Sequence, residues 1–248
     1  MAQDKPTIVI VHGAWHHPEY FSTVGHSLES KGYEVVCPRL PTCNNAIPPD
    51  QTLSDDVALI RSTALKLADA GKEIVVLCHS YGGVVSTDAL YDLSVEKRAA
   101  QNLKGGIKRL AYMCAFIPKK GEGLADIFGG TLPPWIQPQP NKTLALVNPE
   151  NHFFHDTSDP EHWASLLVTH PTDAQSDPVS HEAWREIPVT YLICEGDQGL
   201  LLEFQKMMIA RIEAEGVRVT TETCTASHSP FLSMPQRVVE LAINVANS

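Results

Sequence analysis

The sequence predicts an α/β fold with a mainly parallel sheet of about six strands and helices on both faces. Short runs rich in apolar and β-branched residues recur along the chain, and segments with helical periodicity separate them. Most of these runs are continuously apolar, as in strands covered on both faces, and helical crossovers join parallel strands. With 248 residues, 43% of them hydrophobic, the chain is long enough to bury one such core.

Six runs have the composition of strands. They lie at 7–11, 33–37, 73–78, 107–114, 189–194 and 217–221. Because a helical segment separates most neighbouring runs, we expect right-handed crossovers that place the strands side by side in one sheet.

Four segments have apolar residues spaced by three and four, which predicts amphipathic helices. They run through 21–28, 57–67, 204–212 and 238–245. The second opens with a capping box formed by Thr52 and Asp55 and stops at Gly71, and the last has Pro235 in its first turn.

The stretch 118–187 differs from the rest of the chain. It is rich in proline, contains three of the four tryptophans and has no strand-like run. Proline at this density disfavours a sheet layer. We therefore expect an inserted cap of short helices, one of them near 160–170, on a core formed by 1–117 and 188–248.

Charge and hydropathy restrict the possible partners. The chain carries 19 Lys and Arg against 29 Asp and Glu, a formal charge of −10, which repels phosphate backbones and anionic lipid. The longest apolar run, 110–117, is eight residues, far below the roughly 20 that span a bilayer. We expect a small-molecule substrate, no nucleic-acid or membrane partner, and a monomer or homodimer.

The chain begins MAQDKPT, without the long apolar core of a secretory signal, and its six cysteines are scattered without a regular spacing. These features predict a cytoplasmic protein with buried, reduced thiols.

A serine in the segment 77–83, Leu-Cys-His-Ser-Tyr-Gly-Gly, lies between a predicted strand and a predicted helix. This is the context of a nucleophile elbow, in which the serine occupies a strained turn and its neighbours two residues away are small. Gly82 meets that requirement, whereas Cys78 replaces the usual first glycine. We predict that Ser80 is a nucleophile; the alternative is a glycine-rich turn whose serine only caps the helix.

A serine nucleophile needs a histidine base that is oriented by a carboxylate. In this architecture both follow the serine, at the carboxyl ends of later strands. Asp197 and His228 occupy such positions, with Glu195 as a lower-ranked acid. The alternative for His228 is a surface or packing role.

Acyl transfer also needs two N–H donors for the developing oxyanion. We predict the backbone N–H of Tyr81, directly after the serine, and that of Ala14, in the loop that follows the first strand. The alternative is that the glycine in this loop only ends the strand.

Histidines at 16–17 and 152–155 are weak metal signals, because no carboxylate or cysteine completes a ligand set. We expect neither a metal nor a cofactor. Aromatic residues near the site line an apolar pocket or pack the cap onto the sheet. We predict substrate contacts from Trp15, His16, Trp135 and Phe154.

Six segments, spread over nearly the whole chain, together resemble the α/β-hydrolases, in particular the small-capped branch of plant methyl esterases, hydroxynitrile lyases and their microbial relatives. The segments are VHGAWH (11–16), HSYGG (79–83), LAYMCAFIP (110–118), FFHDTSDPEHW (153–163), YLICEGD (191–197) and HSPFLSMP (228–235). The resemblance implies an α/β-hydrolase fold with Ser80, His228 and Asp197 as a triad and with Ala14 and Tyr81 as oxyanion donors.

Two positions depart from the hydroxynitrile lyases of this branch. Those lyases carry a threonine after the first motif histidine and a lysine directly after the catalytic histidine, whereas this chain has Gly13 and Ser229. The pattern favours hydrolysis of a carboxylic ester, such as a methyl ester or lactone of a small hydrophobic metabolite. A non-hydrolytic cyclase or lyase that uses the same triad, and a ligand-binding receptor on this fold, are the alternatives.

Overall fold

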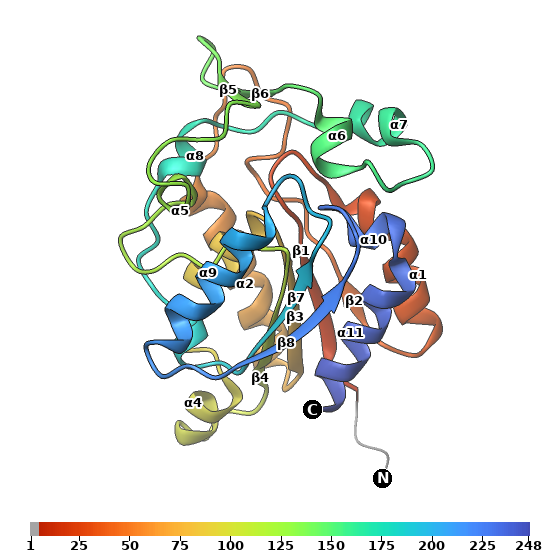
Figure 1. Cartoon of the computed structure of the whole chain (residues 1–248). Helices are drawn as coiled ribbons and strands as arrows, with labels where there is room; N and C mark the ends of the chain where they lie inside the picture. The colour runs from red at the N-terminus through yellow and green to blue at the C-terminus, as the bar shows by residue number, and fades with distance from the viewer. Residues whose placement is uncertain (1–4) are drawn as a thin grey trace.

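One parallel sheet of six strands forms the centre of the protein (Figure 1). The structure is a computed structural model, and it describes residues 5–248. The strands lie in the order β2-β1-β3-β4-β7-β8, and every neighbouring pair is parallel. Their bounds are β1 (Thr7–Val11), β2 (Val35–Val36), β3 (Glu73–His79), β4 (Gly106–Met113), β7 (Val189–Cys194) and β8 (Val219–Cys224). The predicted α/β class and its mainly parallel sheet are confirmed.

The strands are buried according to their place in the sheet. Every residue of β1 and β7 is buried, and so is β3 after its first residue, because these strands have neighbours on both sides and helices on both faces. At one edge β2 has only two residues, shorter than the predicted run. At the other edge only Val219 and Cys224 of β8 are buried, and the strand extends three residues beyond the predicted end.

Helices cover both faces of the sheet (Figure 1). α1 and α11 pack together on one face, and α2 packs with α3 on the other. The four predicted helices are observed as α1, α2, α9 and α11, and the N–H of Thr52 donates to the Asp55 carboxylate at 2.8 Å in the predicted capping box of α2. The bounds are η1 (Pro18–Phe21), α1 (Ser22–Ser30), α2 (Leu53–Asp69), α3 (Gly82–Ala89), α4 (Val95–Ala100), α9 (Leu202–Glu213), α10 (Pro230–Ser233) and α11 (Pro235–Asn247).

Most of the chain between β4 and β7 lies over the carboxyl ends of the strands, and its last part returns to the amino-terminal end of β7 (Figure 1). Its elements are α5 (Leu124–Ile127), β5 (Ile136–Pro138), β6 (Leu144–Leu146), α6 (Pro149–Phe153), α7 (Pro160–Ser165), α8 (Asp173–Ser176) and η2 (Ala183–Arg185). The prediction that this stretch has no strand is wrong, because β5 and β6 form an antiparallel hairpin. Proline is tolerated there because it ends the first of two strands that pair only with each other. The division into core and cap at 118 and 188 stays a prediction.

All six cysteines are free, and five of them are buried. Within the described part of the chain, no helix has both the length and the apolar character needed to cross a membrane. The prediction about a secretory signal concerns residues 1–4 in part, and these lie outside the described residues.

Candidate active site

Ser80 lies at the sharp turn from β3 into α3. Its φ of +51° is in the left-handed region, which is uncommon for a residue with a side chain. The turn is close to the end of β1: a Cβ on Gly82 would lie 2.2 Å from the carbonyl oxygen of Val11. Only glycine fits there. The thiol of Cys78, at the other position where a small residue is expected, lies 3.6 Å from the carbonyl oxygen of Ala111 on the neighbouring strand.

The imidazole of His228 lies between the Ser80 hydroxyl and the Asp197 carboxylate. His228 Nε2 is 2.9 Å from Ser80 Oγ, and His228 Nδ1 is 2.7 Å from Asp197 Oδ2. Asp197 follows β7 and His228 follows β8, at the carboxyl ends of two adjacent strands. The lower-ranked acid, Glu195, is exposed to solvent.

Backbone amides hold the Asp197 carboxylate in place. Its Oδ1 accepts hydrogen bonds from the N–H groups of Gly199 at 2.7 Å and Leu200 at 2.8 Å, which leaves Oδ2 for the histidine. Because a carboxylate only accepts, His228 carries its proton on Nδ1 and directs the lone pair of Nε2 at the serine hydroxyl. This arrangement can accept a proton from Ser80.

Two further buried histidines hold the loops around this group. The Nε2–H of His79 donates to the backbone carbonyl of His228 at 2.9 Å, and the Nδ1–H of His16 donates to that of Ala14 at 2.8 Å. Burial lowers the pKa of His16 to about 3 and the pKa of His79 well below its usual value, so both rings are neutral at pH 7. Sequence reasoning did not identify this supporting contact of His79.

The predicted oxyanion donors border the same space. Ala14 lines a cavity together with Ser80 and His228, and a Cβ on Gly13 would lie only 2.8 Å from Ser80 Cβ. Tyr81 immediately precedes the first residue of α3. Between residues 5 and 248, the backbone N–H groups of Ala14 and Tyr81 have no backbone carbonyl partner, so both are available to a bound oxyanion.

The cavity over Ser80 and His228 is narrow and mostly apolar, with a volume of about 20 Å³. It adjoins a wider groove of about 390 Å³ that shares Phe128, Trp135 and Gly199 with it. The cavity is lined by Ala14, Trp15, Ser80, Phe116, Leu124, Phe128, Trp135, Ile136, Phe153, Gln175, Gly199 and His228.

Two of the four predicted substrate contacts, Trp15 and Trp135, line this cavity. The other two, His16 and Phe154, are not among its lining residues; both are buried and their rings pack against Tyr20. Sequence reasoning also missed Gln175, since a glutamine in an irregular segment gives no signal of where its side chain points.

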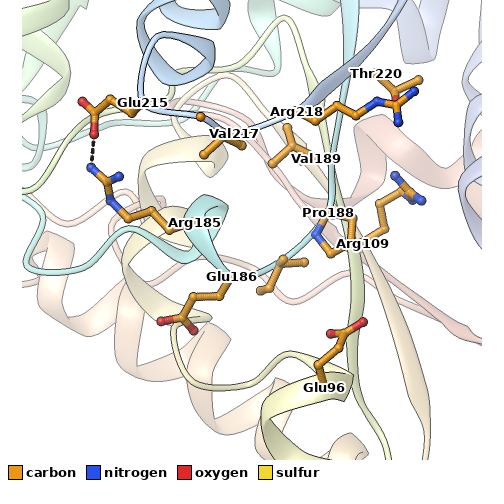
Figure 2. Close-up of a pocket in the computed structure, with 12 residues that line it drawn as sticks. Glu96, Arg109, Arg185, Glu186, Pro188, Val189, Glu215, Val217, Arg218 and Thr220 are labelled. Carbon is orange, nitrogen blue, oxygen red and sulfur yellow. Dashed lines mark hydrogen bonds and ion pairs between the residues drawn. The ribbon is translucent and has the colours of Figure 1, made fainter.

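A larger cavity of about 750 Å³ lies near the amino-terminal ends of β7 and β8 (Figure 2). Its lining is charged, and Arg185 forms an ion pair there with Glu215 (Figure 2). None of the described residues that line it is a serine, cysteine or histidine. Because it has no such nucleophile and no histidine base, it is not the candidate active site.

His79, Cys114 and His228 place their side-chain nitrogen and sulfur atoms within 4.8 Å of one another. These atoms have other partners: both nitrogens of His228 contact Ser80 and Asp197, and His79 Nε2 donates to a carbonyl. Burial raises the pKa of the Cys114 thiol to about 12, so it stays protonated. The group therefore does not offer three free lone pairs to a metal.

The chain belongs to the alpha/beta hydrolase family, whose family model matches residues 8–241. The fold and the geometry of this site agree with that assignment. The protein is an enzyme of the α/β-hydrolase type. "Alpha/beta hydrolase nvfD" of Aspergillus novofumigatus is 32% identical over 98% of this chain and 97% of its own length. "Methylesterase 7" of Arabidopsis thaliana is 22% identical over 98% and 97%.

Among solved structures, a pyrethroid hydrolase from Sphingobium faniae superposes with a TM-score of 0.78 over 98% of both chains, at 21% identity. At that identity the likeness establishes the fold. The predicted resemblance to α/β-hydrolases related to methyl esterases is confirmed.

Proposed function

We propose that this protein is a serine esterase that cleaves a carboxylic ester, such as a methyl ester or lactone, of a small hydrophobic metabolite. The observation that carries the proposal is the 2.9 Å contact between His228 Nε2 and Ser80 Oγ, with Asp197 on the other side of the imidazole. A serine hydroxyl is a weak nucleophile at neutral pH, and this contact supplies the base that it lacks.

The reaction has two halves. Ser80 Oγ attacks the ester carbonyl while His228 Nε2 takes its proton, and the same proton passes to the departing alkoxide, which leaves an acyl-enzyme. A water molecule then loses a proton to His228 and attacks the acyl carbonyl. As the bond between the acyl carbon and Ser80 Oγ breaks, His228 returns this proton to Oγ, so that the acid is released and Ser80 is regenerated. Asp197 orients the imidazole and stabilises it while it carries the positive charge.

The oxyanion of each tetrahedral intermediate would accept hydrogen bonds from the N–H groups of Ala14 and Tyr81. Each such donor contributes about 3 kcal/mol to lowering a barrier of this kind. Among the described residues, no backbone carbonyl accepts a hydrogen bond from the N–H of Ala14 or of Tyr81, and this supports the proposed role.

The lining of the site supports an apolar substrate. No Asp, Glu, Lys or Arg lines the cavity or the adjoining groove among the described residues, so a charged substrate would lose its hydration without a compensating partner. The name of the relative methylesterase 7 supports an ester as the reacting group.

The test uses p-nitrophenyl acetate and a fluorophosphonate probe. We expect wild-type protein to cleave the ester and to be labelled at Ser80, and Ser80→Ala to lose both. Ser86→Ala is the matched control, because Ser86 is a buried serine of α3 outside the cavity; it should retain both. Labelling of Ser80 without turnover of any ester would contradict hydrolysis and favour a cyclase or lyase. Ligand binding without any product would favour a receptor.

A further inference from the structure

Gln175, a residue that lines the candidate active-site cavity, has an unpaired carboxamide. The residue lies on α8, is 1% exposed and lines the cavity together with Ser80 and His228. Among the described residues, neither its Oε1 nor its Nε2 has a hydrogen-bond partner in the protein. Burying an amide without such a partner is unfavourable, so this arrangement calls for a physical reason.

A second buried glutamine shows how this protein satisfies such a group elsewhere. Gln205 on α9 accepts a hydrogen bond from the N–H of Cys194 at 3.0 Å, and it donates to the carbonyl groups of Cys194 at 2.9 Å and Leu200 at 2.8 Å. Its amide joins the end of β7 to the following loop and is fully bonded. Gln175 has the same side chain and the same degree of burial, but it makes no structural contact of this kind.

Most other residues that line the cavity are apolar. Among them are Phe116, Leu124 and Ile136. The indole N–H of Trp15, another polar group of this lining, already donates to the carbonyl of Leu144 at 3.3 Å. A carboxamide in an apolar wall is suited to orient a ligand, because it both donates and accepts.

We propose that Gln175 is a specificity-determining residue that binds a second oxygen group of the substrate, a hydroxyl or a ketone close to the ester. This inference rests on the proposed esterase function. The oxygenated part that contains the ester would enter the cavity over Ser80, which has to widen on binding because about 20 Å³ holds little more than one water molecule, and the wider groove past Phe128 and Trp135 would hold the apolar remainder. The substrate class is thus an oxygenated ester, such as a hydroxy or keto ester, on an otherwise hydrophobic skeleton.

Buried polar groups discriminate strongly, because a substrate analogue that lacks the matching group leaves them unpaired. For one hydrogen bond to a neutral amide we expect the oxygenated ester to bind about 10- to 100-fold more tightly than its unsubstituted parent.

The experiment measures binding and hydrolysis separately. Dissociation constants of 1-naphthyl butanoate and of its 2-hydroxy, 3-hydroxy and 3-oxo derivatives are determined by calorimetry on Ser80→Ala, which cannot form the acyl-enzyme. We expect at least one derivative to bind about 10- to 100-fold more tightly than the parent. In Ser80→Ala/Gln175→Met this ratio should fall to about one, because methionine keeps the length of the side chain but removes both polar atoms.

Gln137→Met in the Ser80→Ala background is the matched control. Gln137 lies on β5 in the same segment of the chain, but it is exposed and outside the cavity. This variant should keep the preference for the oxygenated derivative. A loss of the preference in both double variants would contradict the assignment to Gln175.

A second readout separates a ligand-binding role from a structural one. Without ligand, Gln175→Met should raise Tm by about 2 to 4 °C, because an unpaired buried amide is replaced by an apolar side chain. A lower Tm would show that Gln175 supports the fold, and would overturn the proposal. So would the absence of any preference in Ser80→Ala, or a preference that survives Gln175→Met. If the preference depends on Gln175 but wild-type enzyme cleaves none of the four esters, the binding role stands and the esterase function fails.

Discussion

His79 and His228 are joined by a hydrogen bond from one side chain to the backbone of the other: the Nε2–H of His79 donates to the carbonyl oxygen of His228 at 2.9 Å. The residue directly before Ser80 thereby holds the loop that carries His228, the proposed base. Because the turn at Ser80 is itself close to β1, this bond connects the two parts of the site whose separation would decide the proposed proton transfer. Their rings also pack together, with centroids 4.8 Å apart.

We predict that His79→Leu lowers kcat by about 10- to 100-fold with a smaller effect on KM, because the His228 loop loses its anchor. His79→Gln should recover much of the loss, since its amide N–H reaches about as far as Nε2 of histidine. Steady-state kinetics with p-nitrophenyl acetate provide the measurement. Equal losses in both variants would argue against the hydrogen bond as the cause.

Asp197→Asn should reduce kcat by about 10⁴-fold. The asparagine oxygen can still accept from the N–H groups of Gly199 and Leu200, so the loop should keep its shape. Its amide nitrogen would then face His228 and donate to Nδ1, which places the imidazole proton on Nε2 and removes the lone pair that Ser80 needs. Circular dichroism checks the fold, and kinetics check the activity.

The control for this prediction is Glu195→Gln, at the exposed rival carboxylate. It should leave kcat within about twofold of wild type, since substitutions of exposed residues that lie outside cores, caps and buried hydrogen-bond networks have small effects. If Glu195→Gln is inactive and Asp197→Asn is active, the assignment of the acid is wrong.

Gly13→Ala should lower activity by about 100-fold, because a shift of the serine of the order of 1 Å is enough for such a loss. Its new Cβ would lie 2.8 Å from Ser80 Cβ and 2.9 Å from His79 Nδ1, so the elbow has to move. The matched substitution Gly25→Ala, in α1, meets only Val35 at 4.0 Å. It should keep activity and stabilise the protein by about 0.5 to 1 kcal/mol. Denaturant unfolding and kinetics on both variants make the comparison, and similar activities would contradict the prediction.

Stability should fall as the pH drops from about 6.5 toward 4. Burial lowers the pKa of His12 to about 4 and those of His16 and His170 to about 3. In this window the unfolded chain binds protons that the folded protein excludes, so acid favours unfolding. Between pH 7 and 5 each histidine contributes on the order of 1 to 2 kcal/mol to this loss.

Asp56 acts in the opposite direction. Burial raises its pKa from 3.8 to about 6, so the folded state binds this proton more tightly and gains stability as the pH falls through that range. These three histidines, together with His79, whose pKa burial also lowers, outweigh Asp56, so urea unfolding at pH 7, 6 and 5 should show a net decrease in the free energy of unfolding. His170→Phe should flatten the pH dependence. An unchanged free energy of unfolding between pH 7 and 5 would contradict the prediction.

Much of the architecture could be predicted because its determinants are local. The continuous apolar runs of β1, β3 and β7 can be buried only between two layers of helices, and the capping box at Thr52 marks the start of α2 without any tertiary information. The same analysis did not find the β5–β6 hairpin. Its two strands have three residues each, too few for a period-two pattern to stand out.

In the candidate site, too, some residues could be predicted from the sequence and others could not. Ser80, Asp197 and His228 were selected by their order along the chain and their places after strands, and parallel strands bring such places to one edge of the sheet. The substrate contacts were not selected reliably. Trp15 lines the cavity while its neighbour His16 points into an aromatic cluster, and Gln175 could not have been chosen from its sequence surroundings.

By itself the amino-acid sequence determined the sheet and its helical layers, because periodicity and strand ends follow from short-range rules. Its motifs, and their resemblance to the α/β-hydrolases, indicated the class of enzyme and the residues to examine for catalysis. Tertiary structure alone decided the 2.9 Å approach of His228 to Ser80, the contact from His79 to the His228 backbone and the unpaired amide of Gln175, a residue that lines the cavity. These depend on how loops from distant parts of the chain pack, and the direction of each side chain there is set by neighbours that are remote in sequence.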